Sequence, residues 1–157
     1  MQVVTKTGSL HETDLNLWLE ETVSLLRKGE LVALDIDILA EEIEDMGRYD
    51  KRALEQNLIR VLQHLLKWQY QPQKRTNSWK ASITEHSLCL NRAFKQSPSL
   101  RKYFEEVFAD CYSDARLIAA QETGLQLDVF PEICAYSFLN VLNPQYLPDD
   151  FSHHERD

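Results

Sequence analysis

Glycine and proline are scarce in this sequence, which has four glycines and five prolines among its 157 residues. Turn-rich β folds need these residues to reverse the chain at short intervals, whereas here long stretches of good helix formers lie between them. The sequence therefore predicts an all-α fold, a single-domain irregular bundle of about five helices with an extended C-terminal segment that wraps over it. We expect residues 14–148 to form this domain, between flexible termini at residues 1–13 and 149–157.

Long apolar runs and paired cysteines are also missing. No window approaches the roughly 18 uninterrupted apolar residues of a membrane-spanning helix, and the N-terminus lacks the apolar stretch of a signal peptide. The three cysteines, Cys89, Cys111 and Cys134, are odd in number and show no CxxC spacing, which argues against a disulfide framework or a zinc site. We expect a cytoplasmic protein that makes no contact with membranes.

The signatures of common enzymes are absent from the chain. There is no P-loop and no GxSxG motif, and the few glycines leave little room for a phosphate-binding loop. Cys111 falls on the predicted apolar side of its helix, where a thiol is an inert small hydrophobe. The sequence therefore predicts no cofactor and contains no complete catalytic constellation, and it leaves open whether the protein is an enzyme.

Helix boundaries follow from the capping residues. Asp14 is a suitable N-cap and Gly29 a suitable left-handed end for the first helix. A second apolar pattern opens at Asp35 or Asp37 and keeps its phase across Gly47, which favours one long helix; two helices joined by a tight corner are the alternative. Further helices are expected from near Ser78 to Phe94, from about Pro98 to Gly124, and over residues 136–142.

The densest acidic run, EEIEDMGR at residues 41–48, invites a metal-site interpretation. At 100° per residue, Glu41 and Asp45 point away from the apolar side of their helix. The inward side is predicted to consist of four apolar residues: Ile36, Leu39, Ile43 and Met46. Di-metal sites in helical bundles need Glu and ExxH ligands that project inward from several helices, and ExxH does not occur here. We therefore interpret the run as a solvated face and predict no metal site.

Two histidines and an aspartate form a candidate polar cluster in the core: His64, His86 and Asp114. All three fall on or near the predicted inward sides of their helices, and a buried carboxylate such as Asp114 needs a partner. Arg116 is another candidate for that role. One hypothesis is a hydrogen-bonded cluster that fixes the register of the helices, and the other is a metal site or an acid/base pair.

The stretch KWQYQPQKRTNSWK, residues 67–80, contains four basic residues, two tryptophans and a tyrosine, and no acidic residue. The chain as a whole carries a net charge of −8, which opposes general attraction to phosphates, so a nucleic-acid site would have to be local. Because Trp68 and Trp79 line up with apolar residues, we expect them to pack inside the bundle and Tyr70 to be the exposed ring. The candidate binding corner consists of Lys67, Tyr70, Lys74, Arg75 and Lys80. It is either a single-strand binding site, with charge beside a stacking ring, or a basic rim that contacts a protein or the acidic body of the chain.

Several motifs occur together in this order: EEIEDMGR, HLLKWQYQP, SPSL, DARLIAAQETGL and FPEICAY. This combination resembles the family known as domain of unknown function 29, which is abundant in cyanobacteria, and the similarity extends from about residue 14 to residue 148. The chain departs from the family pattern at Ala135, where a proline commonly follows the cysteine. The resemblance implies a bacterial protein with a compact helical domain. It implies no activity, substrate or catalytic residue.

The leading functional hypothesis is a small protein-interaction or accessory module without catalysis, whose partner is another protein or a second copy of the chain. One alternative is a nucleic-acid-associated factor, such as an antitoxin-like or nuclease component, that uses the corner at residues 67–80. The second alternative is a metal-dependent enzyme with its site in the bundle core.

Overall fold

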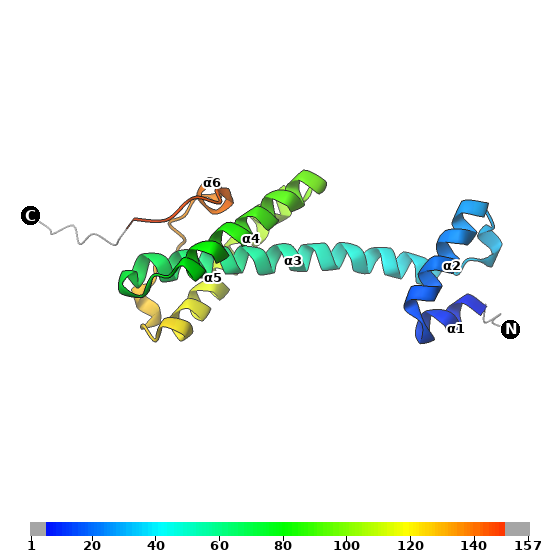
Figure 1. The fold of residues 1–157 in the computed structure, drawn as a ribbon, viewed down its shortest axis with the longest axis horizontal. Coiled ribbons are helices and arrows are strands. Elements are labelled where there is room, and N and C mark those ends of the chain that lie inside the picture. Colours follow the sequence, from blue (N-terminus) through cyan, green and yellow to red (C-terminus); the bar gives the residue numbers. More distant parts are fainter. Residues whose placement is uncertain (1–5, 150–157) are drawn as a thin grey trace, which may run out of the picture. The chain divides into compact units, whose positions relative to one another are not determined.

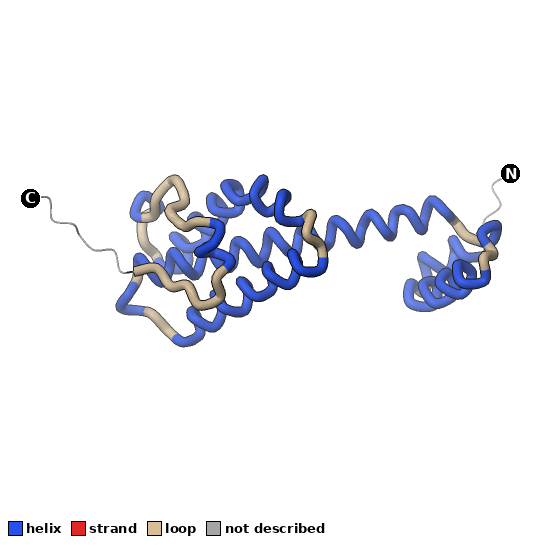
Figure 2. Tube along the Cα trace, turned by 90° about the horizontal axis from the view of Figure 1, so that it is seen from above, coloured by secondary structure: helices blue, strands red, loops and turns tan. Residues whose placement is uncertain are grey.

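The structure is a computed structural model that describes residues 6–149, and its ordered elements are helices. These residues contain no strand and form six α-helices, so the predicted all-α fold is confirmed (Figures 1 and 2). The α-helices are α1 (Lys6–Thr13), α2 (Leu15–Lys28), α3 (Ile36–Tyr70), α4 (Asn77–Gln96), α5 (Leu100–Thr123) and α6 (Phe138–Leu142). Three short 3-10 helices connect them: η1 (Leu31–Ala33), η2 (Pro72–Lys74) and η3 (Leu127–Val129).

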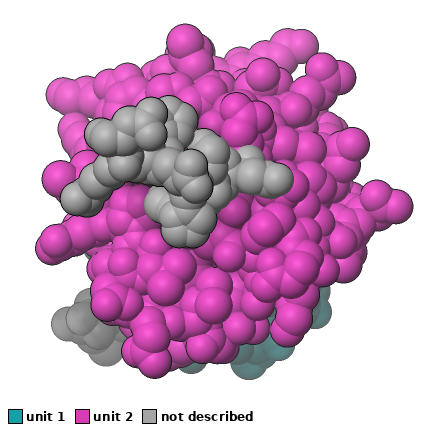
Figure 3. All heavy atoms as spheres, turned by 90° about the vertical axis from the view of Figure 1, so that its left-hand side faces the viewer, with its two compact units in different colours: residues 1–49 teal, residues 50–157 magenta. Residues whose placement is uncertain are grey.

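The chain divides into two compact units, where the sequence predicted one domain over residues 14–148. Unit 1 comprises residues 1–49 and unit 2 residues 50–157, shown in different colours in Figure 3. The predicted flexible N-terminus at residues 1–13 includes α1, which sequence reasoning missed because KTGSLHET contains just one large apolar residue and so has no period. Of the predicted flexible C-terminus at residues 149–157, residues 150–157 lie outside the described part of the chain.

The predicted caps form the ends of the helices. The Asp14 carboxylate accepts a hydrogen bond from the Leu17 backbone N–H at 3.0 Å, and α2 ends at Gly29 with φ of 72°, a left-handed value that glycine adopts without strain. α5 ends in the same way at Gly124, with φ of 73°. Of the two residues proposed to open α3, Asp35 is the cap, since its carboxylate accepts from the Ile38 N–H at 3.1 Å.

Helix α3 continues through Gly47, so the prediction of one long helix is confirmed and the tight corner is excluded. A glycine inside a helix costs about 1 kcal/mol relative to alanine. A Cβ added at Gly47 would meet no atom within 4 Å, so nothing around it in the structure requires a glycine. None of the described helices has the length and apolar character needed to cross a membrane.

Unit 2 contains the main apolar core, which nineteen buried apolar residues build between the second half of α3, α4, α5 and the C-terminal segment. Phe104 lies at its centre with no exposed surface, and its ring meets those of Phe94, Phe108 and Phe138 edge to face at 5.3–5.6 Å between centroids. Because these rings come from α4, α5 and α6, they fix the three helices against one another.

The C-terminal segment is held onto unit 2 by hydrogen bonds to its backbone. The Tyr112 hydroxyl donates to the carbonyl of Pro131 at 2.5 Å, and the buried Ser87 hydroxyl donates to the carbonyl of Val141 at 3.0 Å. Ser137 begins α6 with a capping box. The extended wrap and its short helix, both predicted from the sequence, are therefore present.

Candidate functional site

The predicted cluster of His64, His86 and Asp114 does not assemble. His64 on α3 donates from Nδ1 to the carbonyl of Arg60 at 2.8 Å, and His86 on α4 donates from Nδ1 to the Asn57 amide oxygen at 2.8 Å. Burial lowers the pKa of both histidines, which favours neutral imidazoles near pH 7. Asp114 is exposed, so the prediction that its carboxylate faces inward is wrong.

The position of Asp114 follows from the face that α5 buries. That face includes Phe104, Phe108, Cys111, Ala115 and Ala119, spaced three or four residues apart. Asp114 precedes Ala115 by one residue and is therefore rotated by about 100° toward solvent. Among the described residues, no group of three or more His, Cys, Asp or Glu side chains is arranged to hold a metal ion.

A groove of about 570 Å³ lies beside His86 on unit 2. Its polar lining comes from Gln56, Asn57, Arg60 and Gln63 of α3, His86 of α4 and Glu122 of α5. The hydrogen bond to Asn57 places the His86 proton on Nδ1 and leaves Nε2 as a base. The lining contains no serine, threonine or cysteine, so the groove offers hydrogen-bonding groups but no nucleophile for this base to activate.

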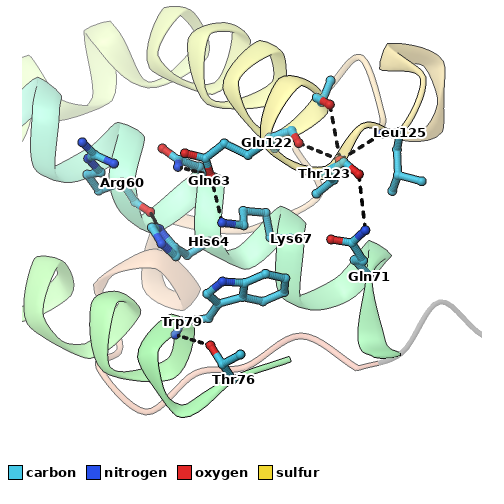
Figure 4. A network of polar contacts seen from close by, with 12 residues as sticks. Arg60, Gln63, His64, Lys67, Gln71, Thr76, Trp79, Glu122, Thr123 and Leu125 are labelled. Atoms are coloured by element: carbon cyan, nitrogen blue, oxygen red, sulfur yellow. Dashed lines mark hydrogen bonds and ion pairs between the residues drawn. The ribbon is translucent and has the colours of Figure 1, made fainter. Parts of the chain in front are cut away.

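A charged network includes Gln63 and Glu122, two residues of the groove lining (Figure 4). The side chain of Lys67 is 10% exposed, and its Nζ donates to Glu122 Oε2 at 2.8 Å while lying 4.5 Å from the centroid of the Trp79 ring. Gln63 donates to the same carboxylate oxygen at 2.8 Å. Burial acts to raise the pKa of Glu122, but the hydrogen bonds from Lys67 and Gln63 outweigh it and the pKa is lowered. The network therefore ties α3, α4 and α5 together.

Most side chains of the candidate corner at residues 67–80 pack against other residues of unit 2. Tyr70, expected as the exposed ring, is half-buried and meets Phe130 edge to face at 5.4 Å. The Arg75 guanidinium lies 4.8 Å from the centroid of the Trp68 ring, and its Nε donates to the Trp68 carbonyl at 2.8 Å. Both tryptophans of the corner are half-buried beneath a cation. The exposed cations of the corner are Lys74 and Lys80.

Two of the three thiols of unit 2, those of Cys111 and Cys134, are poorly suited to nucleophilic chemistry. Burial raises the pKa of Cys111 to about 12 and that of Cys134 to about 11, so both are thiols at neutral pH. This agrees with the prediction that Cys111 is an inert core residue.

Most of the exposed large apolar side chains among the described residues lie on unit 1. Among the described residues, eleven of the seventeen exposed large apolar side chains belong to unit 1, but just two of the twenty-one buried apolar residues do, Trp18 and Leu34. The exposed residues of α2 include Leu15, Leu19, Val23 and Leu26, which recur at three- and four-residue spacing and share one side of the helix. We call these four residues the α2 apolar face.

A second uncovered face lies on the part of α3 that belongs to unit 1. Ile36, Ile43 and Met46, which the sequence predicted to face inward, are 58%, 60% and 67% exposed, so that prediction is wrong. A contact between α1 and this part of α3 lies on a different side of the helix, where His11 Nε2 is 2.5 Å from Glu42 Oε1. We call Ile36, Ile43 and Met46 the α3 apolar face.

Comparison with known proteins places the chain in a family. The family described as domain of unknown function DUF29 matches residues 10–147. The chain belongs to the DUF29 family. Neither the curated proteins nor the solved structures gave a significant match.

Charge is distributed unevenly along this DUF29 chain. Residues 1–49 hold 11 acidic and 4 basic side chains, a net charge of −7, whereas residues 50–157 hold 14 acidic and 13 basic side chains, a net charge of −1. The acidic run predicted to be solvated is exposed at Glu41 and Asp45. The uncovered apolar faces of this DUF29 protein therefore lie on its strongly acidic unit.

Proposed function

We propose that this DUF29 protein is a protein-interaction module without catalytic activity, and that unit 1 binds the partner through its two apolar faces. The observation that carries the proposal is the contrast between eleven exposed and two buried apolar residues in unit 1. Large exposed apolar patches on a folded protein commonly mark the surfaces that bind other proteins.

The amount of exposed apolar surface supports a stable complex. The seven side chains of the two faces range from 44% to 67% exposed. Together they offer on the order of 700 Å², which is close to the roughly 800 Å² that each partner contributes to a standard protein–protein interface. At about 25 cal/mol per Å², covering such a surface adds substantially to the stability of a unit with so small a core.

The other two functional hypotheses find less support. In unit 2 the packing of Lys67, Tyr70 and Arg75 leaves Lys74 and Lys80 to attract a nucleic acid, without a freely accessible ring for stacking. A metal-dependent reaction would need His64, His86 and Asp114 to converge, and Asp114 lies at the exposed side of its helix. We propose a cytoplasmic setting, which suits the three free cysteines.

The proposal is tested by partner capture with the full-length chain. Leu19→Asp together with Ile43→Asp places a charge in each apolar face, and because both positions are exposed the helices are expected to remain folded. The matched control is Leu139→Asp on unit 2, where the wild-type side chain is 75% exposed. Proteins captured by each chain are identified by mass spectrometry, purified, and titrated against it.

We expect a purified partner that binds the wild-type chain and the Leu139→Asp control equally, and that binds the double variant at least about 100-fold more weakly. Circular dichroism of all three chains checks that they are folded. A partner that binds all three chains with the same affinity would show that the apolar faces of unit 1 are not the binding surface.

A further inference from the structure

The inference concerns the kind of partner that fits the α3 apolar face, and it rests on the proposed function. At 100° per residue, Ile36, Ile43 and Met46 lie on one side of α3 and form one edge of a strip that runs along the helix. Ala40 and Gly47 lie next to Ile36 and Ile43, within about 60° around the helix, and are seven residues apart. The strip is therefore a row of large apolar side chains beside a row of small residues.

Gly47 leaves open space on this strip that no described residue fills. It sits inside a helix at a cost, and no neighbour within 4 Å would oppose a Cβ there. Glycine permits another backbone to approach a helix closely. Since no described residue makes such an approach, the open space over Gly47 is suited to a helix that the structure does not contain.

The charges beside the strip indicate what that helix carries. Asp37 and Glu44 lie just beyond Ala40 and Gly47, seven residues apart and both exposed. The Glu44 carboxylate is 3.9 Å from Arg48, the one basic residue between positions 36 and 49, and Arg48 also pairs with Asp45. With Glu41 and Asp45 included, this side of α3 carries four carboxylates against one cation between positions 36 and 49, so the rim of the strip has a net charge of −3 and attracts a cationic partner.

We infer that the α3 apolar face binds a cationic amphipathic helix of a partner protein, which packs closely over Gly47 and directs Lys or Arg side chains toward Asp37 and Glu44. Apolar residues of such a helix at i, i+3, i+4 and i+7 fit the spacing of Ile36, Ile43 and Met46. A second copy of the chain is disfavoured as the occupant, because it would bring two units of net charge −7 against each other.

The test measures binding of three synthetic peptides of about 20 residues to the full-length chain. The first is an amphipathic helix of leucine and lysine, the second has the same apolar positions with glutamate in place of lysine, and the third has the first peptide's composition in a scrambled order. Titrations are followed by anisotropy of a label on the peptide, at low salt and at about 0.3 M salt.

We expect the cationic amphipathic peptide to bind at least about tenfold more tightly than either other peptide at low salt. Ile43→Asp should lower its affinity by at least about tenfold, and Asp37→Asn with Glu44→Gln should lower both the affinity and its salt dependence. Leu139→Asp on unit 2 is the matched control and should leave binding unchanged.

Gly47→Ala separates a binding role from a purely structural one. In the free chain the alanine should raise the melting temperature, because its Cβ meets nothing and the helix propensity improves. The same Cβ should weaken binding of the cationic peptide by several-fold, and Gly47→Leu should weaken it further. A gain in stability with unchanged affinity for the peptide would overturn the close packing over Gly47.

The outcomes distinguish this inference from the proposed function. If the acidic amphipathic peptide binds as tightly as the cationic one and Ile43→Asp abolishes both, the charge preference is wrong and unit 1 remains the binding surface. If the scrambled peptide binds equally, or if no peptide binds, the helical partner is wrong. If light scattering shows a dimer that Ile43→Asp dissociates, the occupant is a second copy and the inference is overturned.

Discussion

Removing the Glu122 carboxylate should destabilise unit 2 by about 2 kcal/mol. Breaking a fully buried ion pair by deleting one partner costs about 3–5 kcal/mol, because the other charge is left buried. Here the Lys67 side chain is 10% exposed but that of Glu122 is 40% exposed, so water screens part of the loss. The Trp79 ring, 4.5 Å from Lys67 Nζ, still attracts the ammonium group by about 0.5–2 kcal/mol.

The prediction is checked by urea denaturation of Glu122→Ala, Lys67→Met and the double variant. Lys67→Met keeps an apolar stem of similar length and removes the charge together with its desolvation cost, so it should lower the free energy of unfolding by about 1 kcal/mol, less than Glu122→Ala. The double variant should lose at least about 0.5 kcal/mol less than the two single losses combined. A loss below about 0.5 kcal/mol for Glu122→Ala, or strict additivity, would refute the reasoning.

Three further predictions concern unit 2. Burial lowers the pKa of His64 and His86, so their contribution to stability is present above the unfolded pKa of about 6.5. That contribution is lost as pH falls through the lowered folded pKa values. Urea midpoints should therefore fall between pH 7.5 and pH 5, and the variant His64→Gln should show a weaker dependence of the midpoint on pH. Because the pKa of Cys111 is raised to about 12 and that of Cys134 to about 11, a thiol reagent at pH 8 should modify both slowly in the native chain, and all three cysteines should react rapidly in denaturant. Phe104→Ala should lower the free energy of unfolding by about 3–5 kcal/mol in the same urea assay, because the ring is fully buried, whereas a loss below about 1 kcal/mol would contradict its central place in the core.

Local features of the fold could be predicted from the sequence because neighbouring residues determine them. The capping carboxylate of Asp14, the left-handed glycines at 29 and 124, and the continuity of α3 through Gly47 all depend on chain chemistry within a turn or two. The extended C-terminal wrap was also indicated, because its prolines and its lack of an apolar period exclude a long helix.

Which apolar side is covered could not be predicted in the same way. Ile36, Ile43 and Met46 have the period of a buried helix side, but a period identifies an apolar side without stating what covers it. The α3 apolar face stays exposed in unit 1, whose buried apolar residues are Trp18 and Leu34. The signal that could have indicated this is charge, since net charge −7 is concentrated in the same 49 residues.

The candidate polar cluster failed for a related reason. A wheel at 100° per residue locates a side chain to within about a third of the helix circumference, which does not separate an inward Asp114 from an outward one. Likewise, the corner at residues 67–80 contained the right residue types, but its cations contact aromatic rings and a carboxylate distant in sequence, Glu122. Such pairings depend on how helices pack and are not visible in the local sequence.

The most direct test of the central claim is amide hydrogen exchange along the full-length chain, alone and with the cationic amphipathic peptide. In the free chain, amides of residues 15–28 and 36–49 should exchange far faster than those of residues 54–66 and 104–120, because unit 1 has two buried apolar residues and unit 2 has nineteen. The peptide should slow exchange in residues 36–49 and leave unit 2 unchanged. Equal protection of both units in the free chain, or slowing confined to unit 2, would contradict the claim that unit 1 carries the uncovered binding surface.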